Sequence, residues 1–149
     1  MNLHTQITLL LLIVGLHAFA QEKFAVAEGQ VLFDGYDPVS YFENAPEKGN
    51  EEYSINHEGR KIYFLNESNK QRFLLDSEKY FPTYGGWCSI SMTKGLFVYP
   101  DYSFYKIQDG RLHFFAVKAF YNGKTAWEKD PELHQIIADK KYEEYFPEQ

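Results

Sequence analysis

The single cysteine of this sequence, Cys88, follows two glycines and a tryptophan. If a helix begins there, its unpaired amides and its dipole favour the thiolate over the thiol. Met92 comes four residues later and would share the same helical face, so a thiolate and a thioether would form a pair of soft donors suited to Cu(I). The alternative is that Cys88 is a small buried hydrophobe and that Met92 fills a gap in the core.

Histidine is the other residue type that could complete a metal site. His57, His113 and His134 follow the first twenty residues, and no pair of histidines has the spacing of a local metal motif. A composite site of Cys88, Met92 and one distant histidine, for which we take His57, would therefore have to be assembled by the fold. Its ion would be copper or another soft metal.

Motifs for catalysis are not recognisable in the chain. It contains no GxSxG elbow, no HExxH pair and no glycine-rich phosphate loop. We therefore expect a protein that is not an enzyme. A thiol-dependent enzyme that pairs Cys88 with a histidine is the least favoured alternative, since such partners need only meet in space.

Aromatic residues offer a second kind of site. The chain has Phe 13, Tyr 12 and Trp 2, and several of these rings gather in two short segments. They could line a pocket for a small ligand, although such rings are more often part of the core. The residues predicted to form this pocket are Tyr36, Asp37, Tyr41, Tyr84, Gly85, Gly86 and Trp87.

Composition excludes several classes of function. The chain has 149 residues and a formal net charge of −6. An acidic protein without clustered Lys and Arg is not expected to bind nucleic acid, nor to be a polybasic membrane-surface protein. One cysteine excludes both an internal disulfide framework and a zinc ribbon of four cysteines.

The first twenty residues resemble a secretory signal peptide. Residues 7–16 are almost entirely apolar, and Ala18-Phe19-Ala20 forms a small-x-small cleavage site. An apolar run of this length is well short of the roughly 20 residues that span a bilayer. We predict cleavage after Ala20, a periplasmic or secreted mature protein, and no stable membrane insertion after cleavage.

The elements that must position these residues are short. Residues 53–56 and 61–65 are predicted to be paired strands, and so are residues 104–108 and 111–117, which flank the turn Asp109-Gly110. The pattern predicts an α+β fold, a single small domain of β-hairpins with interleaved short helices and a C-terminal helix.

Capping residues predict where the helices begin. Ser68, with Gln71 three residues later, matches a capping box at the start of one helix. Asp130 precedes Pro131, an arrangement typical of the start of the C-terminal helix. A short helix is also expected within residues 87–94, which would place Cys88 in its first turn.

Two motifs in this order resemble the secreted YHS-domain-containing proteins: GYDPVSYF at 35–42 and KYFPTYGGWC at 79–88. The resemblance implies a YHS-like domain over residues 21–149. The YHS domain is regarded as a metal-binding module whose metal-associated branch carries a pair of cysteines. Here Leu65 and Asn69 stand where those thiols are expected, so the usual ligand pair is missing. The Tyr-Gly-Gly-aromatic-Cys segment is typical of the secreted branch.

The function predicted from the sequence is a secreted or periplasmic, non-enzymatic binding module of the YHS type. Its ligand would be a soft metal ion such as copper, bound through Cys88. The alternative is a domain that binds a small molecule or a secreted protein partner through an aromatic-lined pocket, without a metal.

Overall fold

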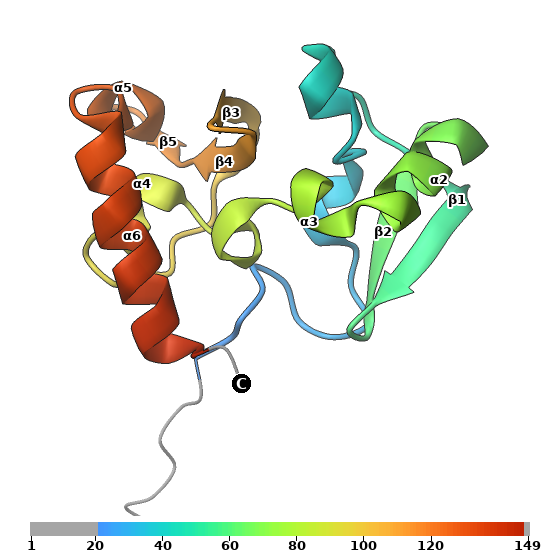
Figure 1. Cartoon of the computed structure of the whole chain (residues 1–149), viewed down its shortest axis with the longest axis horizontal. Helices are drawn as coiled ribbons and strands as arrows, with labels where there is room; N and C mark the ends of the chain where they lie inside the picture. Colours follow the sequence, from blue (N-terminus) through green and yellow to red (C-terminus); the bar gives the residue numbers. More distant parts are fainter. Residues whose placement is uncertain (1–20, 148–149) are drawn as a thin grey trace, which may run out of the picture.

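Antiparallel hairpins carry the strands of this chain, and short helices connect them, in the computed structural model that describes residues 21–147 (Figure 1). The predicted fold class, α+β with β-hairpins, interleaved short helices and a C-terminal helix, is confirmed. The predicted signal peptide, residues 1–20, lies outside the described residues. Within the described part of the chain, no helix has the length and apolar character needed to cross a bilayer.

The first half of the domain is built on one hairpin, in which β1 (Asn50–His57) pairs with β2 (Arg60–Phe64). Two 3-10 turns precede this hairpin and two helices follow it: η1 (Leu32–Gly35), η2 (Ser40–Glu43), α2 (Glu67–Leu75) and α3 (Ser77–Tyr80). These elements lie on the right of Figure 1.

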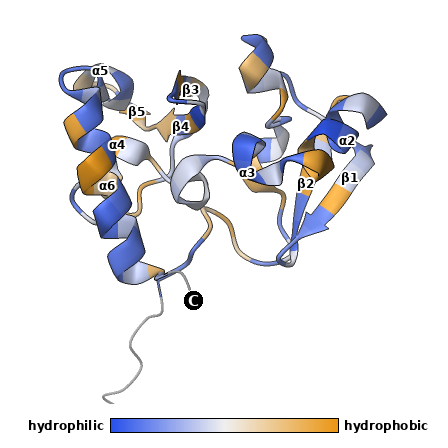
Figure 2. Cartoon of the chain, viewed as in Figure 1, coloured by the Kyte–Doolittle hydropathy of each residue, from blue (hydrophilic) through white to orange (hydrophobic). Residues whose placement is uncertain are grey.

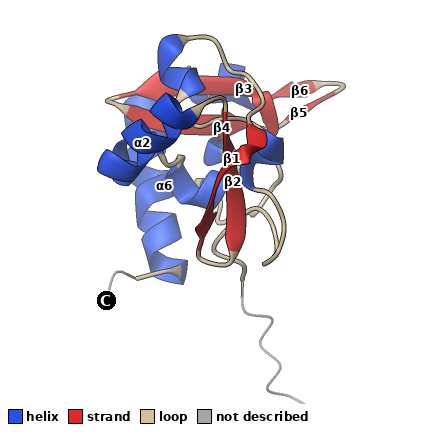
Figure 3. Cartoon of the chain, turned by 90° about the vertical axis from the view of Figure 1, so that its right-hand side faces the viewer, coloured by secondary structure: helices blue, strands red, loops and turns tan. Residues whose placement is uncertain are grey.

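The second half is built on a longer hairpin, in which β3 (Asp101–Gln108) pairs with β4 (Arg111–Phe115). Figure 3 shows this hairpin running crosswise to β1–β2. The remaining elements of this half are η3 (Thr83–Gly86), α4 (Ser89–Met92), β5 (Val117–Lys118), β6 (Tyr121–Asn122), α5 (Gly123–Trp127) and α6 (Pro131–Tyr145). The short helix α4 packs against both α5 and α6.

Strand β4 divides the interior into two apolar clusters. Side chains alternate across a strand, so Leu112 and Phe114 enter the cluster of the first half, while Phe115 enters that of the second. Between them, the buried His113 ring faces the second cluster and lies 4.8 Å from the Trp127 ring. The helix α6 carries alternating apolar and polar bands (Figure 2), and it closes the second cluster through Ala138.

Local hydrogen bonds confirm one predicted helix start and correct another. The Asp130 carboxylate accepts from the Leu133 amide at 3.2 Å, and α6 begins with Pro131, as predicted. The capping box of Ser68 and Gln71 is wrong, because α2 begins at Glu67. Its N-cap is Asn66, whose side chain accepts from the amide of Asn69 at 2.9 Å. An Asx cap two residues earlier takes the place of the serine.

Because β4 is buried on both faces, we expect Phe114 to contribute strongly to the free energy of unfolding. Phe114→Ala should lower the free energy of unfolding by about 3–5 kcal/mol, because it opens a cavity in a closed core. Urea denaturation followed by fluorescence measures the difference. The matched control is Phe120→Ala, at a fully exposed ring, which should change the free energy by less than about 0.5 kcal/mol. Equal losses in the two variants would contradict this assignment of the core.

Candidate functional site

Cys88 lies in the interior at the start of α4, fully buried. Its sulfur accepts hydrogen bonds from the Ala116 amide at 3.1 Å and from the Ser91 hydroxyl at 3.3 Å. Met92 is also fully buried and belongs to the same apolar cluster. The fold therefore brings these two predicted ligands into one core region, with the sulfur of Cys88 held by donors of the protein itself.

His57, the third predicted metal ligand, belongs to the other half of the molecule. Its ring stacks on Phe81 at 4.7 Å and meets the edge of Phe24 at 5.9 Å, and partial burial lowers its pKa. Both of these rings pack in the first cluster, whereas Cys88 and Met92 lie in the second. Among residues 21–147, no group of three or more His, Cys, Asp and Glu side chains could hold a metal ion.

Asp37, from the predicted ligand pocket, is a fully buried carboxylate that organises the backbone around it. It accepts from the amides of Val39 at 2.8 Å and Leu65 at 2.9 Å, and from the side-chain amide of Asn69 at 2.6 Å. These three hydrogen bonds tie the turn before η2 to β2 and α2. Such a set of donors holds a buried carboxylate without a ligand.

Two tyrosines of the same predicted pocket lie beside each other, with ring centroids 6.0 Å apart. Tyr41 is fully buried and donates its hydroxyl to the Tyr102 carbonyl at 2.8 Å, and burial raises its pKa. Tyr36 is half-buried and borders a separate hollow of about 600 Å³ that it shares with Tyr99 and Lys118. Only Tyr36 of these two faces open space.

The Tyr84-Gly85-Gly86-Trp87 segment turns sharply, with φ of 57°, 63° and 88° at its first three residues. A Cβ atom at Gly85 would overlap the Lys23 carbonyl oxygen, so the close approach of the chain requires glycine there. The Gly85 carbonyl accepts from the Ala25 amide at 3.0 Å, and the Trp87 indole donates to the Glu22 carbonyl at 3.1 Å. The N-terminal lead-in thus covers this segment.

Tyr84 points away from that lead-in toward α6. It donates its hydroxyl to Asp139 at 2.8 Å, and Arg111 donates two bonds of 2.8 Å to the same carboxylate. Burial alone would raise the pKa of Asp139, but the bonds from Arg111 and Tyr84 more than offset it, so that pKa is lowered. This group fixes α6 on the β4 side and borders a hollow of about 1020 Å³ that includes Tyr142 and Phe146.

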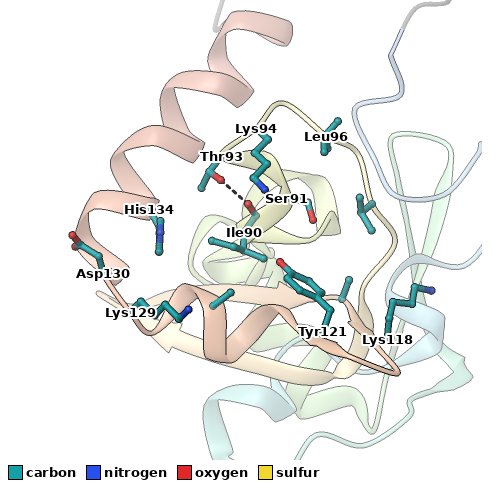
Figure 4. Close-up of a pocket in the computed structure, with 13 residues that line it drawn as sticks. Ile90, Ser91, Thr93, Lys94, Leu96, Lys118, Tyr121, Lys129, Asp130 and His134 are labelled. Carbon is teal, nitrogen blue, oxygen red and sulfur yellow. Dashed lines mark hydrogen bonds between the residues drawn. The ribbon is translucent and has the colours of Figure 1, made fainter.

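The most apolar of these three hollows lies elsewhere, between α4, the β5–β6 hairpin, α5 and the start of α6 (Figure 4). Its volume is about 500 Å³, within the range of small-molecule sites. We call it the α4–β5 pocket. It is lined by Ile90, Ser91, Thr93, Lys94, Leu96, Val98, Ala116, Lys118, Tyr121, Ala126, Lys129, Asp130 and His134.

The α4–β5 pocket combines an apolar wall with cationic side chains. Ile90, Leu96, Val98, Ala116 and Ala126 supply apolar surface, and Lys94, Lys118 and Lys129 are exposed lysines among the lining residues. In the described part of the chain, the ion pairs made by lysines involve other residues: Lys23, Lys48, Lys61, Lys70 and Lys141. The three pocket lysines therefore remain free to meet an anion.

Two polar residues beside the pocket are already engaged by the fold. The Asp130 carboxylate caps α6, which orients it toward backbone amides. His134 Nδ1 lies 2.9 Å from the Trp127 carbonyl, so Nδ1 carries the proton and Nε2 stays available as an acceptor. Asp130 is the one carboxylate among the lining residues, which leaves three lysines against one acid.

A second buried polar group was not foreseen from the sequence. His113 Nδ1 lies 3.1 Å from the Ser89 hydroxyl and 3.2 Å from the Thr83 hydroxyl, and all three residues are buried. Thr83 donates to the Leu112 carbonyl at 3.1 Å. His113 Nε2 has no hydrogen-bond partner within the described structure. With its serine sealed from solvent, this group joins η3, α4 and β4 instead of presenting a nucleophile.

Compared with known proteins, the chain matches no family model, no curated protein sequence and no solved structure. The YHS resemblance therefore stays a prediction from the two sequence motifs.

The α4–β5 pocket was missed because its residues are spread over the chain and form no motif. A signal was nevertheless present in the charges. Residues 89–98 and 111–127 contain no Asp or Glu, although the chain has 21 acids against 15 Lys and Arg. These two segments supply most of the lining. Acid-free stretches in an acidic protein thus marked the site, while their apposition required the fold.

Burial of the Cys88 sulfur predicts slow modification. In the native protein, iodoacetamide should alkylate Cys88 at least about a hundredfold more slowly than in urea-unfolded protein, because reagent reaches the thiol only when the structure opens. Mass spectrometry of quenched samples measures both rates. Native alkylation as fast as that of the unfolded chain would contradict the buried position.

Burial of His113 predicts that the free energy of unfolding decreases at acidic pH. Burial, followed by the Arg111 charge, lowers its pKa from 6.5 to about 4. As the pH falls through 6.5, the unfolded chain binds a proton that the folded protein does not take up until about pH 4. The free energy of unfolding should therefore fall across that window, by up to about 3 kcal/mol.

Urea denaturation at several pH values measures this slope. His113→Gln should flatten it relative to the wild-type protein measured at the same pH values. An NMR titration of the His113 ring in the folded protein gives the pKa directly. Titration near the ordinary histidine value would contradict the account.

Proposed function

We propose that the protein is an exported, non-enzymatic binding module for small amphiphilic anions, such as medium-chain carboxylates, held in the α4–β5 pocket. The observation that carries this proposal is an apolar hollow of about 500 Å³ with three lysines, free of ion pairs with the described residues, among its lining residues. The alternative predicted from the sequence was a small molecule bound without a metal. We propose such a ligand here, but at other residues than those predicted for its pocket.

The apolar wall would supply most of the affinity. Each buried methylene group contributes about 0.8 kcal/mol, so an alkyl chain against Ile90, Val98 and Ala126 gains affinity with length until the hollow is full. These walls come from α4, the segment after it, and α5. All three are held in place because they pack into the second apolar cluster. A site on such supports is largely formed before its ligand arrives.

The lysines would supply orientation and selectivity for an anion. Lys94, Lys118 and Lys129 come from three separate segments, so the rim of the hollow offers an ammonium group to a carboxylate or sulfonate at more than one place. His134 Nε2 and the Ser91 hydroxyl add polar partners among the lining residues. Charge pairs at an exposed rim select by sign more than they add affinity.

The hydrogen bonds of the Cys88 sulfur favour a role in the wall of the pocket over a role in metal binding. Two residues of the pocket lining, Ser91 and Ala116, donate hydrogen bonds to its sulfur from the pocket side. Cys88 thus stabilises the pocket wall from beneath. Among residues 21–147, no group of three or more His, Cys, Asp and Glu side chains that could hold a metal ion includes this sulfur, and His57 packs against rings of the other cluster.

Calorimetric titration with alkanoates tests the proposed function. Affinity should increase from hexanoate to decanoate, by up to about fourfold per methylene group, and decanol should bind more weakly than decanoate. Lys118→Gln should weaken decanoate binding by roughly fivefold, as expected for one exposed charge pair, and leave decanol unchanged.

A filled pocket gives the sharper test. Ala126→Phe, which places a ring in the hollow, should weaken decanoate binding by about tenfold or more, equivalent to about 1.4 kcal/mol. Ala45→Phe makes the same change at an exposed position in a loop outside the lining and should leave binding intact. Equal affinities in the two variants, with both correctly folded by circular dichroism, would overturn the proposal.

A further inference from the structure

The β5–β6 hairpin ends in an aromatic side chain that contacts nothing in the described structure. Lys118 pairs with Tyr121 across the hairpin, so Ala119 and Phe120 form its two-residue turn. Phe120 is fully exposed, at 104 % of its reference area. Figure 3 shows this hairpin reaching out from the body of the protein. A ring held at such a tip gains nothing for the fold and is available to an outside partner.

The same hairpin borders the α4–β5 pocket. Lys118 and Tyr121, which flank its turn, line the hollow and lie on the hairpin at the right of Figure 4. Leu96, which is 52 % exposed, is a further apolar residue of the lining. The exposed ring therefore lies next to the rim of the pocket, and we call the hairpin together with this rim the hairpin face.

The β5–β6 hairpin and the start of α5 carry positive charge. Residues 117–127 contain Lys118 and Lys124 and no Asp or Glu, within a chain of net charge −6. Lys118 and Lys124 make no ion pair among residues 21–147, where the paired lysines are others. At physiological salt, charges beyond about 8 Å are largely screened, so the local lysines decide what this face meets.

We propose that the hairpin face docks onto an anionic lipid bilayer, with Phe120 in the headgroup region and Lys118 and Lys124 against the lipid phosphates. Aromatic rings favour that interfacial depth, and nearby lysines add electrostatic attraction. In this orientation the mouth of the α4–β5 pocket faces the bilayer, which becomes the source of the amphiphilic anion. The origin of the ligand rests on the function proposed above, whereas the docking itself does not.

The shape of the tip favours a bilayer over a folded protein partner. Specific protein interfaces bury about 800 Å² on each side against a complementary surface. A two-residue turn with one ring offers far less area. A fluid interface accepts a single ring and a few lysines without a matched surface.

Co-sedimentation with vesicles tests the docking. The mature protein should bind vesicles of equal parts phosphatidylcholine and phosphatidylglycerol, bind phosphatidylcholine vesicles much more weakly, and dissociate with added salt. Phe120→Ser should weaken partitioning by roughly tenfold, and Lys124→Gln by roughly fivefold.

Matched controls lie on the other half of the molecule. Leu75→Ser removes another highly exposed apolar side chain, on α2, and Lys79→Gln removes an exposed lysine on α3. Both should leave vesicle binding unchanged. Absence of binding to the anionic vesicles, or equal losses in the controls, would overturn the docking. A dimer that Phe120→Ser abolishes, without vesicle binding, would overturn it too.

Decanoate titration in the absence of vesicles separates the two proposals. Phe120 and Lys124 are outside the pocket lining, so both variants should bind decanoate like the wild type. Vesicle binding without decanoate binding would contradict the pocket function and leave the docking standing. Decanoate binding without vesicle binding would contradict only the docking.

Discussion

Burial of β4 on both faces is the constraint on which the rest of this structure depends. A strand that has water on one face can leave alternate residues polar, but β4 has an apolar cluster on each side, so its residues from Leu112 to Phe115 are all buried. The one polar side chain among them, His113, is held by the Ser89 and Thr83 hydroxyls. The two halves of the protein are joined through this strand.

The position of β4 also determines where a ligand can bind. The predicted site residues Asp37, Tyr41, Tyr84 and Cys88 are buried in the interior and make their polar contacts within the protein. Open space remains at the outer edge, where α4, α5 and the β5–β6 hairpin meet without closing over one another. There the side chains are apolar toward the core and cationic toward solvent. This arrangement suits a ligand with an apolar tail and an anionic head group.

Signals that act over a few residues were predicted well. Asp109-Gly110 forms the turn of β3–β4 with positive φ at both residues, and Asp130 caps α6. Ser68 is not the cap because Asn66, an equally good acceptor, lies two residues before it. Which of the two residues caps the helix depends on where the preceding chain enters the helix. The candidate ligand site could not be predicted, since only long-range packing places Lys94, Lys118 and Lys129 around one hollow.

The central claim, that the α4–β5 pocket binds an amphiphilic anion, is tested most directly by mapping the site in solution. Backbone amide shifts of isotope-labelled protein comprising residues 21–149 would be followed by NMR during titration with decanoate. The account predicts saturable shifts concentrated at α4, the β5–β6 hairpin, α5 and the first turn of α6. Shifts centred instead on residues 36–42 and 84–87, or no saturable shifts at all, would contradict it.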